Sequence, residues 1–135
     1  MNDAHDVVTP MLEDDRKRWE DNLSPLLDDK DKKRYQAAVG SVLYVMHATR
    51  PDLAYTIIRL SQFASCPRAI HWDAIKRVLK YIKGTRHYGI ALGNTTLENA
   101  NRTLLTAYFD AAHADTSSRH STCGYVFLLH GSPIS

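Results

Sequence analysis

The stretch from residue 35 to residue 85 sets the narrowest limits on the fold, because its apolar side chains recur at helical spacing in three successive runs. Pro51 and Pro67 separate these runs. Proline disfavours helical geometry in the residue before it, yet it is tolerated in the first turn of a new helix. The pattern therefore predicts three packed helices: one beginning near Asp31, one following Pro51, and one over residues 69–83.

The apolar positions also predict the buried face of each helix. The expected inner residues are Tyr35, Val39, Val42, Leu43 and Met46 in the first helix, Leu53, Ile57, Leu60 and Ala64 in the second, and Trp72, Ile75, Val78, Leu79 and Ile82 in the third. Gly40 lowers helix propensity, so its presence suggests the close approach of a neighbouring helix or a ligand. Gly84 follows the last predicted turn, where a left-handed cap is expected.

Basic residues gather on the third predicted helix. Lys76, Lys80 and Lys83 follow the spacing i, i+4, i+7 and form a stripe beside the apolar face, with Arg77 further round. A row of lysines about one turn apart can follow a phosphate backbone. Lysines that merely solvate the outer face of a bundle give the same pattern. The stripe therefore predicts either a nucleic-acid contact through these four residues or a solvated face.

Charge is distributed unevenly along the chain, although the formal net charge is only +2. Residues 1–33 carry 6 basic and 10 acidic side chains, residues 34–92 carry 9 and 2, and residues 93–135 carry 2 and 3. The first segment, with little periodicity, is expected to be an acidic polar arm. The basic middle segment favours an anionic partner. No apolar run is long enough to cross a bilayer, so we expect an intracellular protein with reduced cysteines and no membrane partner.

The periodicity changes after Gly84, where short strands replace helices. Residues 88–92 are a weak strand candidate, 103–109 a stronger one that ends at Asp110, and 123–129 a third. The predicted class is therefore α+β: a polar arm over 1–33, a helical bundle over 34–86, a linker over 87–102 and the first antiparallel strands of an unfinished sheet over 103–135. A hairpin that no helix covers leaves an apolar face and open edges.

Four motifs in this order carry a resemblance to a known family. They read YQAAVGSVLYVMHATRPDLAY, LSQFAS, HWDAIKRVLKYIKGTRHYGI, and AYFDAAHAD with RHSTCGYVFLLHGSPIS. Together they cover about three quarters of the chain, which resembles the Pol polyprotein of copia-type LTR retrotransposons. The resemblance implies that residues 34–86 correspond to the thumb and connection of a reverse transcriptase. It implies that residues 103–135 correspond to the truncated start of an RNase H-like domain.

The same resemblance assigns one site residue. Asp110 corresponds to the first carboxylate of the RNase H site, which in the parent enzyme holds Mg²⁺. The family usually reads Asp-Ala-Asp-Trp where this chain has Asp110, Ala111, Ala112 and His113. The paired palm aspartates of the polymerase are not found, and one carboxylate cannot fix two ions. This chain is therefore expected to be catalytically inactive by itself and to bind no metal stably.

Three functions remain open at this point. The chain is expected to be a fragment of a reverse transcriptase/RNase H polyprotein, whose parent role is RNA-directed DNA synthesis and degradation of RNA–DNA hybrids. The alternatives are a non-catalytic nucleic-acid-binding module that uses the third helix, or an inert transposon relic. The implied partners are an RNA–DNA hybrid or primer–template and the remainder of the polyprotein.

Overall fold

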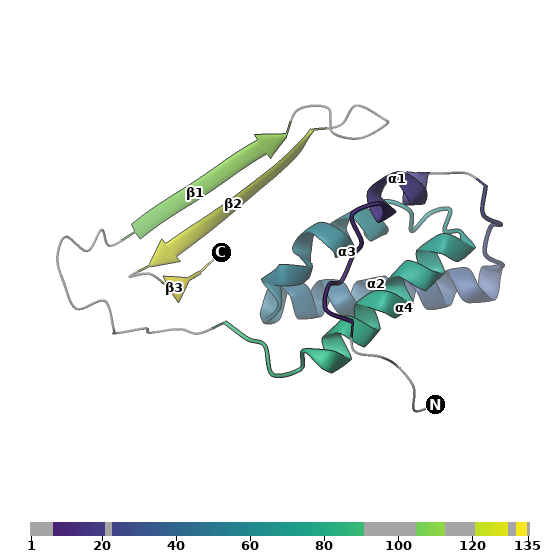
Figure 1. Ribbon diagram of the computed structural model, residues 1–135, viewed down its shortest axis with the longest axis horizontal. Coiled ribbons are helices and arrows are strands. Elements are labelled where there is room, and N and C mark those ends of the chain that lie inside the picture. The colour runs from purple at the N-terminus through teal and green to yellow at the C-terminus, as the bar shows by residue number, and fades with distance from the viewer. Residues whose placement is uncertain (1–6, 21–22, 91–104, 113–120, 130–131, 135) are drawn as a thin grey trace. The chain divides into compact units, whose positions relative to one another are not determined.

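The computed structural model has helices first and a sheet afterwards, so the expected α+β class is confirmed (Figure 1). Its chain divides into two compact units, Met1–Gly89 and Ile90–Ser135, which are described separately. The structure describes residues 7–20, 23–90, 105–112, 121–129 and 132–134.

The described residues of the first unit form five helical segments. They are α1 (Asp15–Glu20), α2 (Asp29–Ala48), the 3-10 turn η1 (Pro51–Leu53), α3 (Ala54–Ser61) and α4 (Ala69–Gly84). The first predicted helix, α2, begins two residues before Asp31 because the Asp28 side chain caps it, accepting a 2.7 Å hydrogen bond from the Asp31 amide. Pro51 opens η1, as its fixed backbone angle allows.

The core of this unit lies between α2, α3 and α4. The predicted inner faces of α2 and α3 are confirmed at Tyr35, Val39, Val42 and Met46 and at Leu53, Ile57 and Leu60, all of which are buried. For α4 the prediction is confirmed at Ile75 and Val78, and Trp72 and Ile82 are partly buried against the core, but the fully buried face also includes residues that were not predicted. It consists of His71, Ala74, Ile75, Val78 and Tyr81, whereas Leu79 is 46% exposed. His71 and Tyr81 were not predicted on this face, but each buries its ring here and satisfies a polar atom with a hydrogen bond.

The end of α4 also differs from the expectation of a left-handed glycine cap. Gly84 is the last residue of the helix, and Thr85 ends it with a negative φ of −111°. The Thr85 amide and hydroxyl both donate to the Tyr81 carbonyl, at 2.9 and 2.7 Å. A threonine side chain therefore satisfies the final turn, and no left-handed residue is needed there.

The segment before α2 belongs to this unit, although the sequence suggested a polar arm. We call its described residues, 7–20 and 23–27, the leader. Trp19 is 2% exposed within the core, and Val7 and Met11 pack against that core. Backbone bonds tie the leader to the entry of α4, from the Leu27 amide to the Pro67 carbonyl (3.0 Å) and from the Ala69 amide to the Pro25 carbonyl (2.9 Å). In Figure 1 the purple leader runs beside α4.

The second unit is an antiparallel sheet in the order β1–β2–β3, with β1 (Leu105–Ala112), β2 (Thr122–Leu129) and β3 (Ser132–Pro133). Leu105 pairs with Leu129 and Ala112 with Thr122. The first strand continues past its predicted end, so Asp110 lies inside it, paired with Gly124. The weak strand over 88–92 is not formed at residues 88–90, and residues 91–92 lie outside the described part of the chain.

The pairing places most of the larger apolar side chains of the sheet on one face, while Tyr108, Val126 and Leu128 lie on the other. The first face carries Leu105, Phe109, Tyr125, Phe127 and Leu129, with the Tyr125 and Phe127 rings 5.6 Å apart. Phe109 is 88% exposed and Tyr125 65%. The described strands therefore bury little apolar surface, in contrast to the helical unit.

Candidate functional site

Three of the four predicted nucleic-acid-binding residues lie together on α4. Lys76, Lys80 and Lys83 are exposed along one side of the helix, over about 10 Å at 1.5 Å per residue. We call these three residues the lysine stripe. The stripe is anchored because the opposite side of α4 packs into the core through Ile75 and Val78. Its ammonium groups can therefore meet an extended anion without any rearrangement of the bundle.

Two contacts modify the predicted basic surface. Lys76 forms an exposed ion pair with Asp73, at 2.6 Å, which reduces the positive charge at one end of the stripe. The sequence carried this signal in the i, i+3 spacing. Arg77 is separated from the stripe, because its guanidinium donates to the Thr9 hydroxyl of the leader at 3.3 Å and is partly buried. The structure thus places Arg77 at a contact within the fold.

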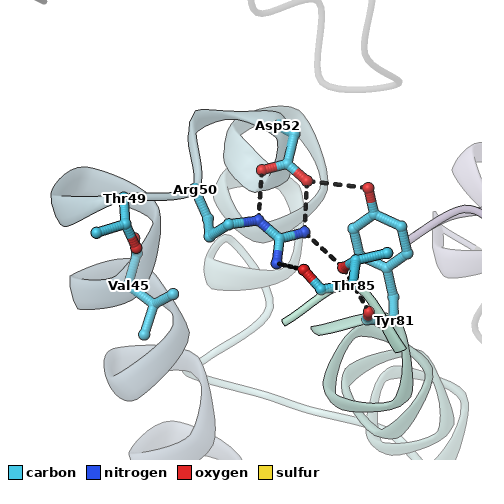
Figure 2. A network of polar contacts seen from close by, with 6 residues as sticks. All are labelled: Val45, Thr49, Arg50, Asp52, Tyr81 and Thr85. Carbon is cyan, nitrogen blue, oxygen red and sulfur yellow. Dashed lines mark hydrogen bonds and ion pairs between the residues drawn. The ribbon is translucent and has the colours of Figure 1, made fainter. Parts of the chain in front are cut away.

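A polar clamp joins the end of α2 to the end of α4, and Figure 2 shows its residues. We define the clamp as Arg50, Asp52, Tyr81 and Thr85. The Arg50 guanidinium, whose side chain is 5% exposed, donates to both carboxylate oxygens of Asp52, at 2.9 Å from Nε and 2.7 Å from Nη2. It also donates to the Thr85 carbonyl and hydroxyl, at 3.0 and 2.8 Å. The Tyr81 hydroxyl donates to Asp52 at 2.9 Å.

The clamp shifts the pKa of each titratable member in the direction that keeps it intact. The hydrogen bonds from Arg50 and, less strongly, from Tyr81 lower the pKa of Asp52, although burial opposes them. The hydrogen bond to Asp52 raises the pKa of Arg50. Burial, and then the hydrogen bond to Asp52, raise the pKa of Tyr81. The Arg50-Pro51-Asp52 sequence read only as a helix break, so its partners on α4 were missed.

His71 is a second polar residue that sequence reasoning missed. Its ring is 1% exposed and stacks on Phe63, with ring centroids 4.1 Å apart. Nδ1 accepts a hydrogen bond from the Arg68 amide at 3.0 Å, so Nε2 carries the proton and donates to the Trp19 carbonyl at 2.9 Å. Burial lowers the pKa of His71, and the charge of Arg68 lowers it further, while the bond to Trp19 opposes this shift. His71 is therefore neutral and links α4 to the leader.

Asp110, the predicted RNase H carboxylate, is exposed on β1 and accepts a 2.9 Å hydrogen bond from the Ala111 amide. Within the described ranges, no three His, Cys, Asp or Glu side chains are grouped so as to hold a metal ion. A single exposed carboxylate does not fit the two-ion chemistry of an RNase H site. We therefore derive no catalytic step through Asp110.

The described residues form helices of moderate length and mixed polarity. None of them combines the length and the apolar character that a membrane-spanning helix needs.

No protein-family model matches the chain, and no solved structure matches it. Curated proteins do match. The secreted RxLR effector protein 161 of Plasmopara viticola is 46% identical over 102 residues, which cover 75% of this chain and 68% of that protein. The retrovirus-related Pol polyprotein from transposon RE2 of Arabidopsis thaliana is 44% identical over 106 residues, 78% of this chain. The one from transposon TNT 1-94 of Nicotiana tabacum is 37% identical over 105 residues, 77% of this chain.

The matched lengths differ greatly between these relatives. The aligned region covers only 7% of the Arabidopsis Pol polyprotein and 8% of the tobacco one, whereas it covers most of the Plasmopara protein. The chain thus corresponds to a short segment of the long relatives and to the larger part of a shorter one. By this similarity, about three quarters of the chain is homologous to a short segment of copia-type retrotransposon Pol polyproteins and to the larger part of the Plasmopara protein.

Proposed function

We propose that the chain corresponds to the reverse transcriptase thumb and connection followed by the start of RNase H, and that it acts as a non-catalytic nucleic-acid-binding segment. In this proposal residues 34–86 bind the backbone of an RNA–DNA hybrid or primer–template, and residues 103–135 begin an RNase H-like sheet. The parent polyprotein would supply polymerase and Mg²⁺-dependent nuclease activity. The remainder of that polyprotein would be a partner of this chain. The chain would be located inside the cell.

The observation that carries this proposal is the lysine stripe. Its three ammonium groups lie on one exposed side of a helix whose other side is fixed in the core. Phosphate contacts by lysine require a surface of this kind and place no demand on base sequence. The neutralising contact of Asp73 affects only Lys76, so Lys80 and Lys83 are expected to contribute most.

Binding to a fluorescent RNA–DNA hybrid across a salt series tests the proposal. The wild-type chain should bind with an affinity that falls as salt rises, because each phosphate contact releases counterions. In the variant Lys76→Glu/Lys80→Glu/Lys83→Glu, the decrease of log affinity with log salt should become less steep. The slope should shrink in magnitude by up to about 2.7, taking the value of about 0.9 per lost contact that holds for duplex DNA.

The matched control changes the net charge by the same amount elsewhere. Lys17→Glu/Lys30→Glu/Lys33→Glu alters three exposed lysines outside α4 and should keep most of the wild-type slope. Equal losses in both variants would show a general charge effect and contradict a site on α4. No binding by the wild type would favour an inert relic. The non-catalytic part of the proposal fails if the chain with Mg²⁺ cuts the hybrid and Asp110→Asn abolishes the cutting.

A further inference from the structure

Buried polar atoms without a hydrogen-bond partner gather at the junction between the leader and the helices, within the described fold. Three buried side-chain atoms lack a hydrogen-bond partner among the described residues: Ser24 Oγ, Arg59 Nε and Arg77 Nε. Ser24 lies in the leader, and the two arginines bind leader residues, Arg59 through Glu20 (2.7 Å) and Arg77 through Thr9 (3.3 Å). Unsatisfied groups concentrated at one junction mark it as a place where local opening costs least.

His71 contacts the leader at this junction through Trp19, and its two hydrogen-bond partners fix the position of its proton. Nδ1 must accept from the Arg68 amide, and Nε2 must donate to the Trp19 carbonyl. A second proton would turn Nδ1 into a donor facing another donor at 3.0 Å. It would also place a charge in a ring that is 1% exposed and stacked on Phe63. A second proton therefore breaks the bond from Arg68 and destabilises the buried position of the ring against the leader, although Nε2 can still donate to the Trp19 carbonyl.

The groups around the ring give that charge no compensation. Tyr35, whose ring centroid lies 6.5 Å away, and Arg68, whose charge lowers the His71 pKa, both interact with the ring. The α1 helix, which carries Trp19, also has Asp15, Arg16, Lys17, Arg18 and Glu20, and α3 has Arg59. Glu20 is held by Arg59, and Asp15 accepts from the Leu12 amide at 2.9 Å. Tyr35 donates to the Leu60 carbonyl at 2.7 Å, and Arg68 is itself cationic. Both hydrogen bonds of the imidazole ring go to backbone groups, so neither partner is an anion.

We propose that His71 is a pH-sensitive lock that holds the leader on α4 near neutral pH and releases it in mildly acidic solution. Release separates the Trp19 carbonyl from the ring and uncovers the surface that Trp19 occupies, while α2, α3 and α4 remain packed. The lock controls access to a buried apolar surface of the helical unit and does not depend on nucleic-acid binding.

The sign of the pH dependence follows from linkage. The pKa of His71 is lower in the docked state than the value near 6.5 of an exposed histidine. As the pH falls below about 6.5, the undocked state binds the proton first, so docking weakens by up to tenfold per pH unit until the docked pKa is reached.

Tryptophan fluorescence of the full chain tests the lock. The chain has two tryptophans, so Trp72→Phe leaves Trp19 as the only reporter. Between pH 7.5 and 5.0 its emission should shift to the red with a midpoint below 6.5, while far-UV circular dichroism keeps most of the helical signal. With His71→Gln added, the emission should stay blue throughout, because the amide can accept from Arg68 and donate to Trp19 but does not titrate.

His87→Gln removes an exposed histidine near the end of α4 and should leave the transition unchanged. A red shift that persists in the His71→Gln variant would overturn the proposal. Should that variant fail to fold, nuclear magnetic resonance of the wild type decides. The His71 ring should titrate below 6.5 in step with the amides of residues 15–20. Titration near 6.5 with no change in those amides would overturn the lock.

Discussion

Gly40 shows how one residue in a helix can be misleading. The sequence suggested that it lets a neighbouring helix or ligand come close. In the structure it is exposed on α2, and a Cβ built there meets nothing within 4 Å. Its cost to the helix is therefore not offset by packing within the described fold. Glycine inside a helix is less favourable than alanine because it loses more backbone entropy on folding.

Gly40→Ala should accordingly stabilise the protein by about 0.5–1 kcal/mol. Urea unfolding followed by circular dichroism measures the change as a higher midpoint at constant slope. Ala37→Gly, at another exposed position on α2, is the matched reversal and should lower stability by a similar amount. If Gly40→Ala lowered stability instead, the space for a methyl group at this position would not exist in the folded protein.

At the level of elements, the helix boundaries were predictable but the contacts between helix ends were not. Pro51 and Pro67 limit the backbone locally, so they could be read from the sequence alone. The clamp joins residues 35 positions apart, Arg50 and Thr85, and no local pattern contains that information. The lysine stripe was also predictable from local sequence, because its three members lie on one helix at a regular spacing.

The clamp leads to a prediction about Asp52. Asp52→Asn removes the carboxylate that balances the buried Arg50, and should cost about 2 kcal/mol, less than a fully buried pair because Asp52 is 37% exposed. The pKa of Asp52 is lowered, so its stabilising effect is present above an ordinary pKa of about 3.9 and is lost as the pH falls below it. Urea unfolding at pH 7 and at pH 3 measures both effects.

Asp73→Asn is the matched control, since it breaks an ion pair of similar length whose two side chains are 50% and 72% exposed. Exposed pairs contribute little, so this variant should lie within about 0.5 kcal/mol of the wild type. Equal losses of stability in Asp52→Asn and Asp73→Asn would show that the burial of Arg50 does not strengthen its ion pair.

At the level of the whole molecule, the two units differ in how much they bury. Every buried core residue of the described chain lies between Trp19 and Tyr81, within the helical unit. The described strands keep their larger apolar residues exposed. The sequence predicted the change from helix to strand because the apolar period changes there. It did not predict the packed leader, because Trp19 belongs to no periodic run and its partners lie far along the chain.

The helical unit should therefore fold alone. A chain of residues 1–89 should show the helical circular dichroism expected for α2 to α4 and unfold in a single transition within a few degrees of the full chain. Broad, non-cooperative melting of this shorter chain would contradict the division, and would show that residues after 89 contribute to the helical core.

The pairing of the leader with α4 has a consequence for synthesis. Trp19 is synthesised before its partner, because the His71 ring that donates to the Trp19 carbonyl lies 52 residues further along. At ribosomal rates of 5–20 residues per second, that partner appears roughly 3–10 s later. Throughout this interval a large aromatic side chain is outside its eventual burial site and open to chaperones or to other nascent chains. Of the two partners in this contact, the one that is synthesised first must therefore wait for the other.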